Sequence, residues 1–108
     1  MPHFIYILEL TNTYKNTGNW TAETNAILEE HWNHLMQMHS KGEVVLVGRT
    51  NLPLDHPDNH GYNIFEADSL EQAQQILESD PTVAKGVMTG KVFPFNLALL
   101  KGEQVVSQ

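Results

Sequence analysis

The feature that most constrains this fold is the order in which two hydrophobic periodicities alternate along the chain. Four segments show the short apolar runs or the alternation typical of β-strands, and two longer segments repeat apolar residues every three or four positions, as amphipathic helices do. Strands are expected at His3–Leu10, Val44–Val47, Gly61–Ala67 and Val87–Leu100, and helices at Thr21–Lys41 and from Ser69 to Asp80. The predicted order is therefore β-α-β-β-α-β.

Capping residues mark the ends of the two expected helices. Gly42 offers a left-handed cap to the first helix. Ser69 and Gln72 have the spacing of a reciprocal capping box at the start of the second helix. Asp80-Pro81 should end that helix, because proline disfavours helical backbone in the residue before it.

The expected strands differ in character. Val44–Val47 is an unbroken apolar run, which predicts a central strand buried on both faces. Pro94 cannot donate a backbone hydrogen bond, so it indicates an edge position or a bulge in the last strand. Loops are expected at Thr11–Trp20 and Asn51–His60.

The element order is that of the ferredoxin-like split βαβ arrangement, an α+β fold in which two helices cover one face of a four-stranded antiparallel sheet. We expect one domain over residues 1–100 and a loose tail over residues 101–108. A chain of 108 residues has no further element to cover the second face of the sheet. A second copy would cover it most economically, so a homodimer is expected.

The charge balance limits the classes of partner. The chain has 13 acidic and 6 basic residues, a formal charge of −7. So few cations argue against binding to nucleic acid or to an anionic membrane. Cysteine is absent, which excludes disulfides and thiolate chemistry and fits a cytoplasmic location.

One titratable side chain interrupts the apolar stripe of the first helix. At about 100° per residue, Ile27, His31, Leu35 and Met38 share one narrow arc, with His31 near its middle. Histidine changes charge near neutral pH and is the most frequent acid–base catalyst. A core histidine with its ring nitrogens bonded to the backbone explains the same pattern, so both interpretations stay open.

Several short motifs, taken in order, resemble the YCII-related proteins. The first half has the helical segment His31-Trp-Asn-His-Leu35 followed by the strand Val44–Gly48. The second half has Asp80-Pro81 and then Val92-Phe-Pro-Phe95. The resemblance extends over most of the chain and implies a dimeric α/β barrel.

The same resemblance implies a His–Asp pair in a cleft near the dimer interface, carried here by His31 and Asp80. In the plainer alternative, Asp80 only caps the turn before Pro81. The chain departs from its relatives at Arg49, where they commonly have proline. Arg49 can hold a carboxylate or phenolate by paired hydrogen bonds, and with His34 it is a candidate for substrate binding. A surface ion pair would also explain Arg49.

Two further groups of residues have plainer explanations. Histidines and carboxylates crowd the first helix and the loop before the third strand, at His31, His34, Asp55, His56, Asp58 and His60. Their spacing matches no known metal signature, so we interpret them as polar residues in contact with solvent, and we expect no metal or other cofactor.

Aromatic residues that could line a pocket, or belong to the core or a dimer interface, are Tyr6, Trp32, Tyr62 and Phe93.

These features favour a small cofactor-independent enzyme. Its His–Asp pair would catalyse proton transfer, elimination or isomerisation on a small, cyclic or anionic compound. A non-catalytic dimer that binds a small molecule or assists a partner enzyme is the alternative, and a metal-dependent oxygenase or isomerase is a third hypothesis.

Overall fold

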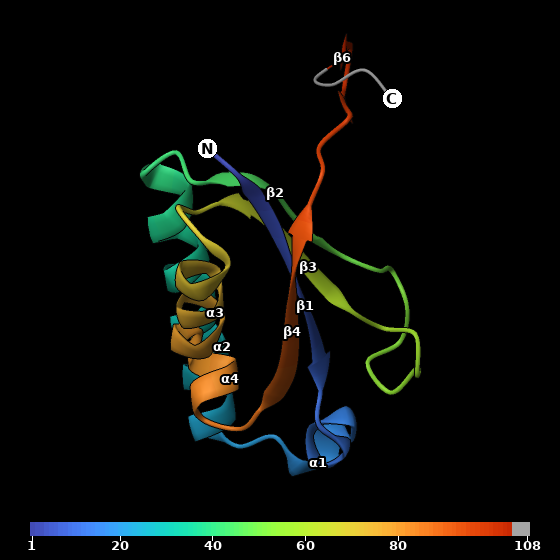
Figure 1. The fold of residues 1–108 in the computed structure, drawn as a ribbon. Coiled ribbons are helices and arrows are strands. Elements are labelled where there is room, and N and C mark those ends of the chain that lie inside the picture. Colours follow the sequence, from blue (N-terminus) through green and yellow to red (C-terminus); the bar gives the residue numbers. More distant parts are fainter. Residues whose placement is uncertain (105–108) are drawn as a thin grey trace.

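The computed structural model describes residues 1–104, and positions 105–108 of the expected tail lie outside the described residues. Four antiparallel strands form one sheet in the order β2-β3-β1-β4. Their bounds are β1 His3–Leu10, β2 Val44–Arg49, β3 Gly61–Glu66 and β4 Met88–Phe95. Figure 1 shows both long helices, α2 (Ala22–Ser40) and α3 (Leu70–Ser79), on the same face of this sheet. The expected ferredoxin-like α+β fold is confirmed.

The core lies between the helices and the sheet because β1 alternates strictly. Its even-numbered residues Phe4, Tyr6, Leu8 and Leu10 are buried, while the residues between them are only partly covered. Leu35 and Met38 of α2 and Ala73 and Leu77 of α3 pack against this row. Burying a large apolar side chain of this kind stabilises a fold by about 1.5–3 kcal/mol, so this row holds the layers together.

The helix α2 lies one residue inside the predicted bounds at each end, because Thr21 and Lys41 are its caps. Thr21 caps its N-terminus and forms a capping box with Thr24, in which each side chain bonds to the other residue's backbone N–H. Gly42 follows its C-terminus at φ +76°, the left-handed conformation that glycine adopts without strain.

The capping box predicted for α3 forms only in part. The Gln72 N–H donates to Ser69 Oγ, as expected. The Gln72 side chain, however, accepts a hydrogen bond from the Asp68 N–H instead of the Ser69 N–H. Ser69 therefore caps the helix, while Gln72 fixes the residue that precedes the cap.

The prediction of a central position for Val44–Val47 is wrong. The strand β2 is at the edge of the sheet, and 51% of Leu46 is exposed. The run is apolar because its alternate residues serve different faces: Val47 pairs with Asn63 on the helix-covered face, and Leu46 pairs with Ile64 on the open face. Pro94 is in the other edge strand, β4, as predicted.

Short helices replace parts of the expected loops. The segment Thr11–Trp20 contains α1 (Asn12–Lys15) and the single 3₁₀ turn Thr17–Asn19. A further short helix, α4 (Pro81–Ala84), follows α3 directly. Such segments are too short to show a hydrophobic period, so periodicity gives no signal for them.

The last strand ends earlier than predicted. The residue pair His3 and Phe95 is the final one between β1 and β4, so β4 has no strand to pair with beyond Phe95. The chain continues to a small hairpin of β5 (Leu99–Leu100) and β6 (Glu103–Gln104), which projects from the body in Figure 1. The first part of the expected tail is thus paired.

No helix in residues 1–104 is long and apolar enough to cross a membrane.

Candidate functional site

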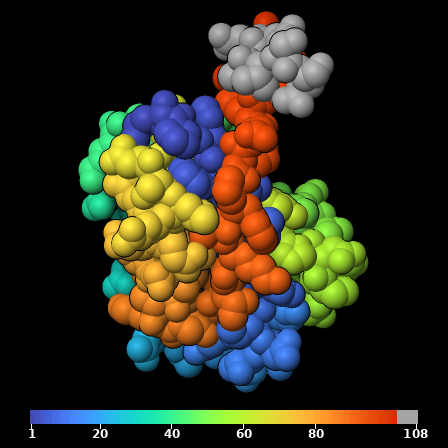
Figure 2. All heavy atoms as spheres, in the orientation of Figure 1, coloured from blue at the N-terminus to red at the C-terminus, as the bar shows by residue number. Residues whose placement is uncertain are grey.

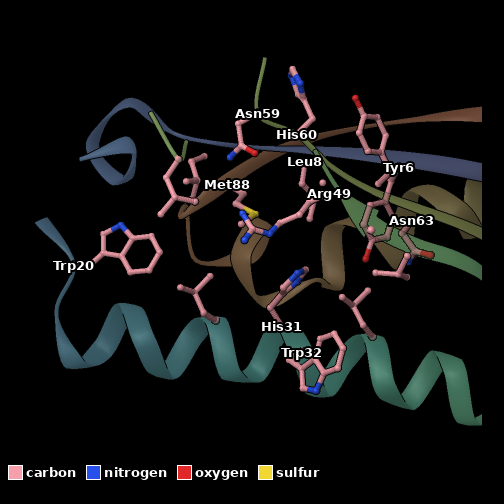
Figure 3. A pocket seen from close by; sticks show the side chains of 18 residues that line it. Tyr6, Leu8, Trp20, His31, Trp32, Arg49, Asn59, His60, Asn63 and Met88 are labelled. Atoms are coloured by element: carbon pink, nitrogen blue, oxygen red, sulfur yellow. The ribbon is translucent and has the colours of Figure 1, made fainter. Parts of the chain in front are cut away.

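A cavity of about 550 Å³ lies between α2 and the helix-covered face of the sheet. Figure 3 shows His31 and Arg49 entering it from opposite walls, His31 from the helix and Arg49 from the sheet. Most of its wall is apolar; this part comprises Leu8, Leu10, Trp20, Leu28, Trp32, Leu35, Val47, Leu54 and Met88. A cavity of this size suits a small organic molecule.

The strand register explains which sheet residues reach the cavity. Val47 and Arg49 of β2 pair with Asn63 and Gly61 of β3, and all four lie on the helix-covered face. On β1, the buried even-numbered residues from Tyr6 onward form the floor. A shift of β2 by one residue would turn Arg49 to the opposite face.

The connection between β2 and β3 forms the rim of the cavity, and in Figure 2 it is the green lobe at the side of the molecule. Its base is closed by Thr50 and His60. The Thr50 N–H donates to the His60 carbonyl at 3.0 Å, and the His60 N–H donates to Thr50 Oγ1 at 3.0 Å. The Thr50 hydroxyl donates to Asn59 Oδ1 at 3.1 Å. Leu54, near the middle of the connection, packs against a buried cluster that includes Leu10.

His31 and Asp80, 49 residues apart, are in direct contact. His31 Nδ1 lies 2.8 Å from Asp80 Oδ1 and 2.9 Å from Oδ2. The Asp80 side chain is fully buried, whereas 19% of the His31 side chain is exposed. The aspartate therefore lies behind the histidine, and the histidine ring meets the cavity.

Three protein donors besides His31 bond to the Asp80 carboxylate. The Tyr6 hydroxyl donates to Oδ2 at 3.0 Å. The Thr82 N–H and hydroxyl donate to Oδ1 at 3.0 Å and 2.7 Å. The Thr82 N–H bond makes Asp80 the N-cap of α4, with Pro81 as the first helical residue.

These bonds keep Asp80 ionised. Burial by itself raises the pKa of the carboxyl, but the hydrogen bonds from His31 and Thr82 outweigh it, and the pKa is below its ordinary value. Burial and the nearby Asp80 charge raise the pKa of Tyr6 far above its ordinary value, so the phenol keeps its proton and donates it. An ionised carboxylate only accepts hydrogen bonds, so His31 Nδ1 must carry the hydrogen. The other ring nitrogen, Nε2, then has a free lone pair when the ring is neutral.

Arg49 lies at the exposed part of the cavity. Within residues 1–104, its guanidinium has no hydrogen bond or ion pair with the protein. The surface ion pair considered from the sequence is therefore absent from the described part of the chain.

His34 is near this site, since the Asp80 charge acts on its pKa, but it is not part of the cavity wall. Its Nε2 is buried with no hydrogen-bond partner within residues 1–104. Burial lowers the pKa of His34, which favours the neutral ring. The structure thus brings His31, Asp80 and Arg49 together but does not add His34 to them.

The histidines of the β2–β3 connection bond locally. His56 Nδ1 accepts from the Asp58 N–H at 3.0 Å, and His60 Nδ1 lies 2.9 Å from the Asp58 carbonyl. In the part of the chain that the structure describes, no three His, Asp or Glu side chains converge to hold a metal ion.

Of the aromatic candidates, Tyr6, Trp32 and Tyr62 line the cavity, while Phe93 pairs with Ile5 in the register of the opposite sheet face. Tyr6 and Thr82 were not predicted as partners of Asp80. The only signal for Tyr6 was its place in the inward-facing row of β1, where a buried hydroxyl needs a partner. Thr82 follows Asp80-Pro81 at the spacing of an N-cap bond, which was a usable signal.

Among solved structures, the chain is similar to 5-chloro-2-hydroxyhydroquinone dehydrochlorinase (TftG) from Burkholderia phenoliruptrix AC1100, in complex with 2,5-dihydroxybenzoquinone. The TM-score is 0.59 at 16% sequence identity, over 87% of this chain and 93% of the other, which supports the fold. No curated protein matches the chain. The model of the YCII-related domain matches residues 1–96, almost the whole described fold. The chain therefore belongs to the YCII-related domain family.

Proposed function

We propose that this protein is an acid–base enzyme for a small organic compound. His31 Nε2 removes a proton from the substrate or returns one to it, and Asp80 fixes the ring and stabilises the imidazolium. The observation that carries this proposal is the contact of His31 Nδ1 with a buried, four-fold hydrogen-bonded carboxylate. That contact assigns the hydrogen to Nδ1 and leaves Nε2 for chemistry.

The reaction class we propose is proton transfer, elimination or isomerisation. All three need a group that takes a proton from the substrate; proton transfer and isomerisation return one to it, and in an elimination the proton passes to the leaving group or to solvent. A histidine–aspartate pair can take and release a proton in this way. The structurally similar protein is named as a dehydrochlorinase, an enzyme of elimination, and this is consistent with the same class. The similarity supports the fold and not a shared substrate.

Solvent exchange across a panel of compounds tests this proposal. Small cyclic compounds with an acidic C–H, such as lactones and cyclic ketones, are incubated with the protein in D₂O and followed by NMR. We expect the wild-type protein to accelerate exchange or conversion of at least one compound. His31→Ala should abolish this acceleration.

The matched control is His39→Ala, which removes an exposed histidine from the same helix and should keep the activity. An acceleration that survives unchanged in His31→Ala would refute the role of His31. Binding of a compound without any exchange or conversion would favour the non-catalytic binding module.

We also propose that the protein acts as a homodimer through the open face of the sheet. Residues with large apolar side chains on this face include Ile5, Ile7, Leu46, Ile64 and Phe93, and 45% of Phe93 is exposed in one chain. Exposed apolar patches of this kind mark interaction surfaces.

Light scattering should give twice the mass of one chain, and Phe93→Asp should halve it. Leu70→Asp, at an exposed leucine of α3, is the control and should leave the mass unchanged.

A further inference from the structure

The acidic composition of the chain does not extend to the cavity. Acidic residues outnumber basic ones by 13 to 6. Yet among residues 1–104 no aspartate or glutamate lines the cavity, whose ionisable side chains are His31, Arg49, His60 and two tyrosines. Arg49 is the permanent cation of this group.

The carboxylate behind the His31 wall of the cavity is not available to Arg49. Asp80 is fully buried behind His31 and bonds to His31, Tyr6 and Thr82. Arg49, on the opposite wall, has no protein partner within the described residues. A guanidinium that the protein leaves unpaired in a largely apolar cavity is suited to hold an anion from outside.

We propose that Arg49 is a specificity-determining residue that selects an anionic compound, a carboxylate or phenolate on a flat apolar body. The anionic oxygens bond to the Arg49 guanidinium, and the apolar body lies against the wall that includes Trp20 and Met88. The part of the compound that reacts then faces His31. This inference rests on the proposed function, because it assigns a substrate class to the same cavity.

The charge distribution also gives the compound one orientation. The anionic group is attracted to Arg49 and repelled by the ionised carboxylate behind His31. Reversing the compound would place like charges together at the His31 end. Arg49 thus both selects the anion and directs its other end toward the histidine.

The experiment compares two probes of nearly the same shape, benzoate and the uncharged benzamide, by calorimetric titration of the full chain. We expect the wild-type protein to bind benzoate at least about tenfold more tightly than benzamide. Arg49→Gln should remove this preference and leave the weak binding of benzamide unchanged. Arg49→Lys should keep part of it, because lysine retains the charge but not the paired hydrogen-bond geometry.

The matched control is Lys41→Gln, which makes the same change in charge at the exposed residue that ends α2, outside the cavity lining. It should retain the preference for benzoate. Equal affinity of the wild-type protein for both probes, no saturable binding of benzoate, or a preference that survives in Arg49→Gln would each overturn the proposal.

A second variant separates this inference from the proposed function. His31→Ala should still prefer benzoate to benzamide, since binding of these probes needs no proton transfer. If His31→Ala keeps full turnover while Arg49→Gln loses the preference, the acid–base assignment fails and the anion site stands. If His31→Ala loses turnover while Arg49→Gln keeps the preference, the anion site fails alone.

Discussion

Two charged side chains lie on opposite sides of one cavity, Asp80 behind the wall that carries His31 and Arg49 at the facing wall, and they differ in the partners that the fold gives them. Asp80 is fully buried and accepts hydrogen bonds from His31, Tyr6 and Thr82. Arg49 is exposed and has no ion pair or hydrogen bond with the protein over residues 1–104. The protein supplies hydrogen-bond partners for the Asp80 carboxylate. It supplies none for the Arg49 guanidinium within residues 1–104, so that group is free to bind a ligand.

This difference separates stability from binding. Removing a buried charge whose partners are all supplied by the protein lowers the free energy of unfolding strongly, because each partner loses its hydrogen bond in the interior. An exposed charge without partners contributes almost nothing to folding. Replacing Asp80 should therefore affect the fold first, and replacing Arg49 should affect the ligand alone.

The largest effect is expected from Asp80→Ala. It leaves the Tyr6 hydroxyl and both Thr82 donors without their acceptor, and the free energy of unfolding should fall by about 3–5 kcal/mol. Urea unfolding followed by circular dichroism measures this loss. The control Asp68→Ala, at an exposed carboxylate, should change stability by less than about 0.5 kcal/mol. If both variants lost the same free energy of unfolding, the buried hydrogen bonds of Asp80 would not contribute to stability.

Removing one donor should cost less than removing the acceptor. Tyr6→Phe keeps the ring in the core but deletes the hydroxyl that bonds to Asp80, and we expect a loss of about 1.5–3 kcal/mol. The same urea titration applies, and the double variant with Asp80→Ala should lose less than the sum of the two single variants. Simple additivity would show that the hydroxyl contributes nothing through Asp80.

The pH dependence should follow the lowered pKa of Asp80. The unfolded chain binds a proton at this carboxyl near its ordinary value of 3.8, whereas the folded chain binds it only at lower pH. The stability that Asp80 contributes is thus fully present above that value and is lost as the pH falls through the lower folded value. Urea midpoints measured from about pH 6 to about pH 2 should fall more steeply for the wild type than for Asp80→Asn. Parallel curves would contradict the ionised state of Asp80 in the fold.

The smallest effect on stability is expected at the other wall. Arg49→Ala breaks no bond within residues 1–104 and should change the free energy of unfolding by less than about 0.5 kcal/mol. Thermal unfolding without added ligand measures it. A loss near that of Tyr6→Phe would mean that Arg49 has a structural partner, and the contrast between the two walls would disappear.

The fold could be predicted largely from local patterns. Alternation in β1, the capping residues of α2 and the Asp80-Pro81 stop each act over a few residues, so the sequence shows them directly. The edge position of β2 could not be predicted in the same way. An apolar run looks alike whether a strand is central or has one face on a cavity and the other open.

The candidate site was only half predictable. Periodicity singled out His31, and the family resemblance supplied Asp80 as its partner. The contact between them depends on how α2 and the start of α4 pack, which no single segment encodes. The same holds for Tyr6, whose inward direction follows from alternation while its bond to Asp80 spans 74 residues. The register that turns Arg49 toward the cavity likewise depends on pairing with β3.

The closed base of the β2–β3 connection has a consequence for how such proteins diversify. The bonds between Thr50 and His60 join the first and last residues of the connection, so the segment between them can change length without altering the strand register. Doubling the length of a flexible loop costs only about 0.6 kcal/mol in closure entropy. The segment between Thr50 and His60 can therefore be exchanged between members of the family. Such an exchange would change the rim of the cavity and leave the histidine–aspartate pair in place.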